Sequence, residues 1–273
     1  GGGRLFALLS KFGPVTVLDA ATGKRLMDYP GTEKAQGMRY LDGILLVRAG
    51  GNRIIAIDVG SGNKLWQDDG KIHAVMAASN GKAYYLNGGR LVCCDLKNGR
   101  EVWHKDEIAG VSQILLKENY LVMTVGKHIK AVEADSGNER WSVQGRTRTA
   151  FLVAGKKQYP SRRSALFIAN NRVWLGLDSL DLATGKSMTP LDASDVHTPG
   201  HHPRCYPGKA TVNYLLTPNR GVEFVSLTGK PNTQNDWLRG PCTFGVLPCN
   251  GLLYVPPNPC FCFPGVKLTG FNA

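Results

Sequence analysis

The chain has 273 residues, 42% of them hydrophobic, and a formal net charge of +12. No apolar run reaches the ~18 residues that a membrane-spanning helix needs, so we expect no transmembrane segment in this sequence. The positive charge would allow attraction to nucleic acid, anionic lipid or acidic glycans, but it is scattered. Its only local concentration, within residues 146–163, shows no nucleic-acid-binding motif, so no nucleic-acid partner is expected.

Short apolar runs punctuated by Gly and Asn recur along the whole chain, which is the signal of β-hairpins. In chain order the clearest expected strands are 43–47, 53–57, 73–77, 82–86, 91–94, 111–116, 120–125 and 129–132. Each unit of about forty residues holds four such runs, and no segment shows a sustained helical period. Counted by hairpins there are seven units, which begin near Arg4, Gly43, Gly81, Asn119, Asn171, Asn213 and Gly251.

One eleven-residue pattern organises these units. In residues 56–66 it places Asp58, Gly62 and Trp66 at fixed spacings, and it returns 37 and then 38 residues later. Two weaker copies keep the acid and the glycine without the Trp, and a further one at 225–230 keeps only Thr-Gly-Lys. The repeat positions are Asp19, Gly23, Asp58, Gly62, Trp66, Asp95, Gly99, Trp103, Glu133, Gly137, Trp141, Asp181 and Gly185.

Each repeat position has a structural role. An acid at the end of a strand can accept hydrogen bonds from backbone N–H groups two or three residues on, which closes an Asx-type turn. The glycine supplies the positive φ that reverses the chain. The Trp starts the next strand and, recurring once per unit, is well placed to pack between neighbouring units. We therefore interpret the repeat acids as turn residues and assign them no role as bases or metal ligands.

The last third of the chain differs in composition, because five of the seven cysteines follow residue 200. A long spacer, 189–212, carries His201, His202 and Cys205, and Cys260 and Cys262 follow two residues apart. Thiolates and imidazoles are ligands that zinc and copper select, so these five residues are the candidate metal ligands. The alternative, which we favour, is disulfides that tie the loop and the last units together, or buried thiols.

The pattern A-x-D-x-x-[TS]-G-x-x-x-W resembles the tryptophan-docking repeat of the PQQ-like (pyrroloquinoline quinone) propeller superfamily. That superfamily includes quinoprotein alcohol dehydrogenases, the propeller lipoprotein of the outer-membrane assembly machinery, and binding proteins without a cofactor. The resemblance covers residues 1–190. The later segments, among them 201–211, 220–224 and 249–254, look like large repeat proteins of planctomycete-type bacteria, some of which carry an additional methyltransferase domain.

The resemblance raises the question of a PQQ cofactor. Quinoprotein dehydrogenases place a vicinal disulfide against the quinone, and Cys93-Cys94 is the matching pair here. This pair sits inside a repeat strand, where adjacent side chains point to opposite faces, so we favour two separate thiols. We match no calcium-binding Glu and Asn and no catalytic Asp, so PQQ is unsupported by matched residues.

The fold predicted from these patterns is an all-β propeller of four-stranded blades, about seven of them present, forming a single domain over 1–273. We expect it to belong to a seven- or eight-bladed ring and to be a fragment truncated at both ends. The resemblance and the cysteine count imply a periplasmic or other extracytoplasmic location. The function expected is a non-catalytic scaffold that binds a protein or glycan on a loop face. The alternative is a quinone- or metal-dependent oxidoreductase.

Overall fold

A computed structural model describes residues 1–144, 151–153, 156–158, 166–197, 204–242 and 244–256. The secondary structure of these residues is entirely β, without any helix that could span a membrane. The chain divides into two compact units, a first unit of residues 1–144 and a second unit of residues 145–273. The prediction that 1–273 forms a single domain stays a prediction.

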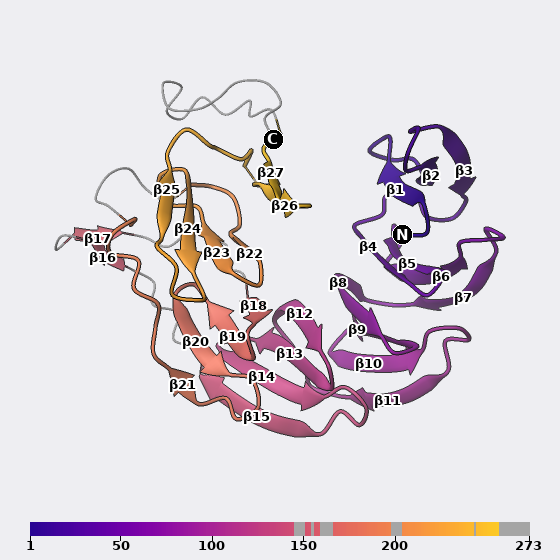
Figure 1. Cartoon of the computed structure of the whole chain (residues 1–273). Coiled ribbons are helices and arrows are strands. Elements are labelled where there is room, and N and C mark those ends of the chain that lie inside the picture. The colour runs from indigo at the N-terminus through magenta and orange to yellow at the C-terminus, as the bar shows by residue number, and fades with distance from the viewer. Residues whose placement is uncertain (145–150, 154–155, 159–165, 198–203, 243, 257–273) are drawn as a thin grey trace. The chain divides into compact units, whose positions relative to one another are not determined.

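The first unit is a series of antiparallel sheets in which sequence neighbours pair (Figure 1). The first sheet is β1 (Arg4–Leu8), β2 (Val15–Asp19) and β3 (Arg25–Tyr29). The second is β4 (Gly37–Leu41), β5 (Ile44–Ala49), β6 (Arg53–Asp58) and β7 (Lys64–Asp69). The third is β8 (Ile72–Ser79), β9 (Lys82–Asn87), β10 (Arg90–Asp95) and β11 (Glu101–Lys105). The fourth is β12 (Val111–Lys117), β13 (Tyr120–Val125), β14 (His128–Glu133) and β15 (Glu139–Gln144).

The second unit continues the pattern in shorter strands. A two-stranded hairpin, β16 (Phe151–Val153) and β17 (Lys156–Gln158), precedes two further four-stranded sheets. These are β18 (Leu166–Ala169), β19 (Arg172–Leu175), β20 (Asp178–Asp181) and β21 (Ser187–Met188), followed by β22 (Lys209–Ala210), β23 (Tyr214–Thr217), β24 (Val222–Ser226) and β25 (Thr233–Asn235). The last described pair is β26 (Leu247–Cys249) and β27 (Leu252–Tyr254).

The predicted architecture is confirmed. A strand begins within one residue of each of the seven predicted unit starts, at β1, β5, β9, β13, β19, β23 and β27. Five of the described sheets have four antiparallel strands in sequence order, which is the blade of a propeller. The fold class is therefore an all-β propeller of four-stranded blades, with seven units present in whole or in part.

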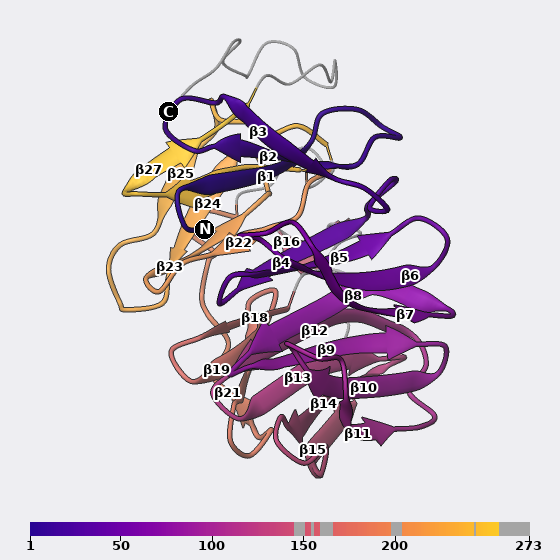
Figure 2. The same cartoon turned by 90° about the vertical axis from the view of Figure 1, so that its right-hand side faces the viewer.

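The core of the first unit lies between successive sheets, which follow one another in Figure 2. Neighbouring residues on a strand enter different clusters: Leu45 packs toward the first sheet, and Leu46 packs toward the third. Tyr85 and Tyr84 divide in the same way between the second and fourth sheets. Both faces of the middle strands are buried, which explains why these strands are continuous apolar runs rather than alternating ones.

Backbone hydrogen bonds join the connections at both ends of the first unit. At one end the loop before each sheet bonds to the next hairpin, as in Gly50 N to Glu33 O at 2.8 Å and Gly88 N to Lys71 O at 3.0 Å. At the other end the residue after each repeat acid bonds to the first turn of its own sheet. Val59 N, for example, donates to Gly43 O at 2.8 Å. We call the first of these the loop end and the second the repeat-turn end.

Candidate functional site

The repeat acids lie in the turns of the repeat-turn end. In the second sheet, Asp58 Oδ1 accepts hydrogen bonds from the N–H and the hydroxyl of Ser61, both at 2.7 Å. The turn closes through Gly62 N to Asp58 O at 2.8 Å and Asp58 N to Asn63 O at 2.9 Å. The same backbone pair closes the turns of Asp19, Asp95, Glu133 and Asp181. Hydrogen bonds from these turns lower the pKa of Asp19, Asp58 and Asp181, with backbone and hydroxyl donors contributing most.

An aromatic side chain of each of the first three sheets reaches the repeat turn of the following sheet. Trp66 Nε1 donates to the carbonyl of Leu96 at 2.8 Å, and Trp103 Nε1 donates to that of Ala134 at 3.0 Å. Each acceptor is the residue directly after the repeat acid. The first repeat has no Trp, and there the hydroxyl of Tyr29 donates to the equivalent carbonyl, Val59 O, at 3.2 Å. Sequence reasoning missed this substitution because Tyr29 lies two residues beyond the Trp position.

The repeat glycines form the surface on which these rings rest. A β-carbon on Gly99 would lie 2.8 Å from Cγ and Cδ2 of Trp66, and one on Gly137 would lie 2.8 Å from Cε3 of Trp103. Both glycines also have a positive φ, +72° and +74°. Two independent reasons therefore favour glycine at each of these positions: the backbone has a positive φ, and the Trp ring leaves no room for a β-carbon.

Cys93 and Cys94 are both buried free thiols on β10. Cys94 packs in the cluster toward the second sheet, whereas Cys93 packs in the cluster toward the fourth. Burial raises the pKa of Cys93 to about 11 and that of Cys94 to about 12. Two thiols on opposite faces of a paired strand do not fit the vicinal disulfide that would stack on a quinone.

Of the five candidate metal ligands, only Cys205 lies among the described residues, and His201, His202, Cys260 and Cys262 lie outside them. Cys205 is exposed, while its neighbours Arg204 and Tyr206 are buried. Within the described ranges no three His, Cys, Asp or Glu side chains are grouped to hold a metal ion. The metal site and the alternative disulfides stay predictions.

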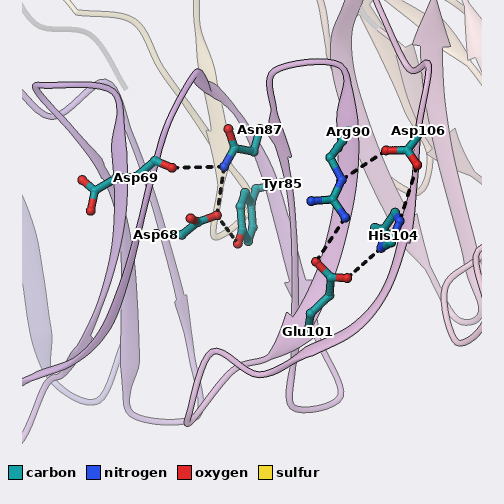
Figure 3. Close-up of polar contacts among 8 residues, drawn as sticks. All are labelled: Asp68, Asp69, Tyr85, Asn87, Arg90, Glu101, His104 and Asp106. Atoms are coloured by element: carbon teal, nitrogen blue, oxygen red, sulfur yellow. Dashed lines mark hydrogen bonds and ion pairs between the residues drawn. The ribbon is translucent and has the colours of Figure 1, made fainter.

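A polar cluster between the second and third sheets was not predicted (Figure 3). The Oδ2 atom of Asp68 accepts hydrogen bonds from the hydroxyl of Tyr85 at 2.8 Å and from Nδ2 of Asn87 at 3.1 Å. Asn87 also donates to the carbonyl of Asp69 at 3.2 Å and accepts from Lys71 N at 3.1 Å. These bonds fix the connection from β7 to β8, and burial of Tyr85 raises the pKa of its phenol.

A second part of Figure 3 is a charged network at β11, the outer strand of the third sheet. Glu101 and His104 lie on β11, Arg90 begins β10, and Asp106 follows β11. Arg90 Nε lies 3.1 Å from Asp106 Oδ1, and His104 Nδ1 lies 2.6 Å from Glu101 Oε1. His104 Nε2 also lies 3.4 Å from Asp106 Oδ2. Charged side chains on an outer strand keep it from pairing with other chains, so the network has a structural role whatever else it contacts.

The second unit contains a buried polar network centred on Glu223 of β24. The side chain of Glu223 is fully buried and accepts the N–H groups of Asn219 at 2.6 Å, Arg220 at 2.8 Å and Gly221 at 2.9 Å. Thr217 links it to His197, whose Nε2 lies 2.8 Å from the Thr217 hydroxyl. Burial raises the pKa of Glu223, opposed by these N–H donors, and lowers the pKa of His197.

The Glu223 network also anchors the segment that carries Cys205. Arg204 Nε donates to the carbonyl of Arg220, and the Tyr206 hydroxyl donates to the carbonyl of Gly221. The sequence signal for this network was a single acid inside the apolar run Val222-Glu-Phe-Val, directly after a Pro-Asn-Arg-Gly turn.

Comparison with known proteins places the fold and the repeat in context. Residues 1–106 and 70–195 match the family described as outer membrane protein assembly factor BamB. BamB from Moraxella catarrhalis is similar in structure, with a TM-score of 0.61 and 13% identity, over 93% of this chain and 75% of that one. The computationally designed protein Ika8 is also similar, with a TM-score of 0.59 and 16% identity, over 91% of this chain and 78% of that one.

A quinohemoprotein alcohol dehydrogenase, ADH IIB of Pseudomonas putida, is 24% identical over 173 residues, which is 51% of this chain. The match spans only 25% of that enzyme's length. The solved structures share the fold, and the family match covers well over half of the sequence. The chain thus belongs to the PQQ-like repeat family described as outer membrane protein assembly factor BamB.

Proposed function

We propose that this chain is a non-catalytic, extracytoplasmic binding module that holds a protein partner on a rigid propeller. The observation that carries the proposal is the use of the repeat acids. The carboxylates of Asp19, Asp58, Asp95 and Asp181 accept backbone N–H groups of their own turns. Carboxylates whose oxygens already accept hydrogen bonds from their own turns stabilise the fold, and they are poorly placed to transfer protons or to bind a cation.

The family match supports a binding role, since the family is named for an assembly factor. The extracytoplasmic location is proposed on the same basis. The rigidity of the first unit suits a scaffold, because each sheet is fixed to the next by a ring hydrogen bond and a buried cluster. The sequence predicts either a protein or a glycan as the partner. The description of the family as an assembly factor favours a protein.

The charged network at β11 is the surface we propose for the partner. Arg90, Glu101, His104 and Asp106 are 39–61% exposed, and they hold one another in place through the ion pairs of Arg90 and the polar contacts of His104. Charges that are fixed in advance favour selective recognition and lose little side-chain entropy on binding. They also discourage unselective pairing at the outer strand.

A crosslinking experiment tests the proposal. A photo-reactive amino acid replaces Asp106 in one variant and Ser61, at the repeat-turn end, in another, and each is illuminated in cells that make the protein natively. We expect a discrete protein adduct from position 106 and none from position 61. Equal adducts from both positions, or none from either, would contradict the proposed surface.

The competing function is a quinone-dependent oxidoreductase, favoured by the identity to the Pseudomonas putida dehydrogenase. The purified protein is mixed with PQQ and Ca²⁺, and its absorption spectrum and dye-linked alcohol oxidation are recorded. We expect the spectrum of free PQQ and no oxidation. A protein-bound quinone band together with alcohol oxidation would replace the scaffold by an enzyme.

A further inference from the structure

The β1–β2 hairpin connection is the longest of the corresponding described connections. Between paired strand residues, the connections β9–β10, β13–β14 and β19–β20 have two residues each, β5–β6 has three and β23–β24 has five. The β1–β2 connection has six, residues 9–14. Insertions in single units of a repeat protein commonly carry binding functions. We call residues 8–13 the hairpin tip.

The hairpin tip presents apolar side chains to solvent. Leu8, Leu9 and Phe12 are 39%, 59% and 61% exposed. The corresponding two-residue turns of the first unit are Gly88-Gly89 and Gly126-Lys127, which carry no apolar side chain. Exposed Leu and Phe side chains that are grouped in one loop mark a site of interaction with a protein or a membrane.

Two lysines lie close to the exposed ring of Phe12. The Nζ atoms of Lys11 and Lys34 lie 5.2 Å and 5.5 Å from the centroid of the Phe12 ring. Lys34 is exposed and belongs to the loop before β4. The neighbouring carboxylate is that of Glu33, which accepts the N–H of Gly31 at 3.1 Å and so is already engaged. The hairpin tip therefore combines an apolar centre with positive charge.

The base of the tip is held firmly. Thr32 is fully buried, and its hydroxyl accepts the N–H of Val15 at 2.8 Å and donates to the carbonyl of Tyr29 at 2.5 Å. Within the tip, Gly13 N donates to Ser10 O at 3.4 Å. An exposed apolar tip with a hydrogen-bonded base and flanking lysines suits the interface of a bilayer with anionic headgroups.

We propose that the hairpin tip is a membrane-contact site, in which Leu9 and Phe12 enter the interface of an anionic bilayer and Lys11 and Lys34 contact lipid phosphates. Two apolar side chains and two lysines give weak, reversible binding that strengthens with the anionic lipid content and weakens with salt. This site is separate from the protein-binding surface proposed at β11, so each can fail without the other.

Vesicle flotation tests the proposal. The whole protein is mixed with vesicles of phosphatidylcholine alone or with phosphatidylglycerol added, at low and high salt. We expect binding to the anionic vesicles only, and a loss of roughly tenfold or more in the L9S/F12S variant. The matched control is Val102→Ser, at an exposed apolar position on β11, which should bind as the unmodified protein does.

A second readout places the contact at the tip. Tryptophan fluorescence of Phe12→Trp should shift to the blue when anionic vesicles are added, whereas that of Val102→Trp should not. Failure of the unmodified protein to float with anionic vesicles, or unchanged binding of L9S/F12S, would overturn the proposal. A tip-dependent crosslink to a protein in vesicle-free extract would also overturn it, because the occupant would then be a polypeptide.

Discussion

Replacing Gly99 with alanine tests how consecutive sheets of the first unit are joined. The β-carbon of Gly99→Ala would lie 2.8 Å from the Trp66 ring, and alanine would have to adopt a φ of +72°. The left-handed conformation alone costs about 1 kcal/mol. Overpacking against a ring that is held by its own hydrogen bond adds about 1–3 kcal/mol. We expect Gly99→Ala to lower the free energy of unfolding by roughly 3 kcal/mol.

The chain offers a matched control for this change. Gly23 stands at the same repeat position with a φ of +71°, but nothing lies within 4 Å of where its β-carbon would be. Gly23→Ala should therefore show the conformational cost alone, and Gly137→Ala, with Trp103 at 2.8 Å, should repeat the larger loss. Urea unfolding followed by Trp fluorescence measures all three. If Gly99→Ala were no less stable than Gly23→Ala, the ring would not rest on the glycine.

Three further predictions test different contacts. Tyr29→Phe removes the hydroxyl that replaces the Trp N–H, and should cost about 0.5–1.5 kcal/mol in urea unfolding, with little change in the slope m. Cys93 and Cys94 should resist a thiol reagent at pH 8 until the protein unfolds. Because their folded pKa values are raised, the stability they contribute is complete below about pH 8.5 and falls as the pH rises toward 11–12, which pH-dependent unfolding would show. Glu223→Gln should lower the free energy of unfolding by about 2–4 kcal/mol and speed amide exchange in the 219–221 turn. The control Glu101→Gln, at an exposed position, should change neither quantity. Equal effects of the two substitutions would contradict the proposed role of the Glu223 network.

The fold could be predicted from the sequence because its determinants are local and repeated. Asp58 and Gly62 close a turn with partners no more than five residues away, and the five copies that carry an acid repeat the same backbone bonds. The division of Cys93 and Cys94 between two faces also follows from strand geometry alone. Seven hairpin units, five of them with this turn, made the unit starts predictable to within a residue.

Contacts between distant residues could not be predicted in the same way. The Trp66 ring was expected between units, but its acceptor, Leu96, is 30 residues away and is a backbone carbonyl that any residue could supply. Tyr29 fills the same role from a different position in its repeat, so a pattern search misses it. The polar residues of the network at β11 are ordinary surface residues in the sequence, and only the pairing of β10 with β11 brings them together.

The β23–β24 hairpin of the second unit is held by an interaction that is not part of the repeat pattern. In the first unit, the β9–β10 and β13–β14 turns have two residues each and contain glycine. In the second unit the β23–β24 connection is longer, and three of its N–H groups turn inward to Glu223. A buried acid satisfied by its own turn fixes a loop that glycine alone would leave free. The same turn then supplies carbonyls that hold Arg204 and Tyr206, so the segment carrying Cys205 is positioned by Glu223.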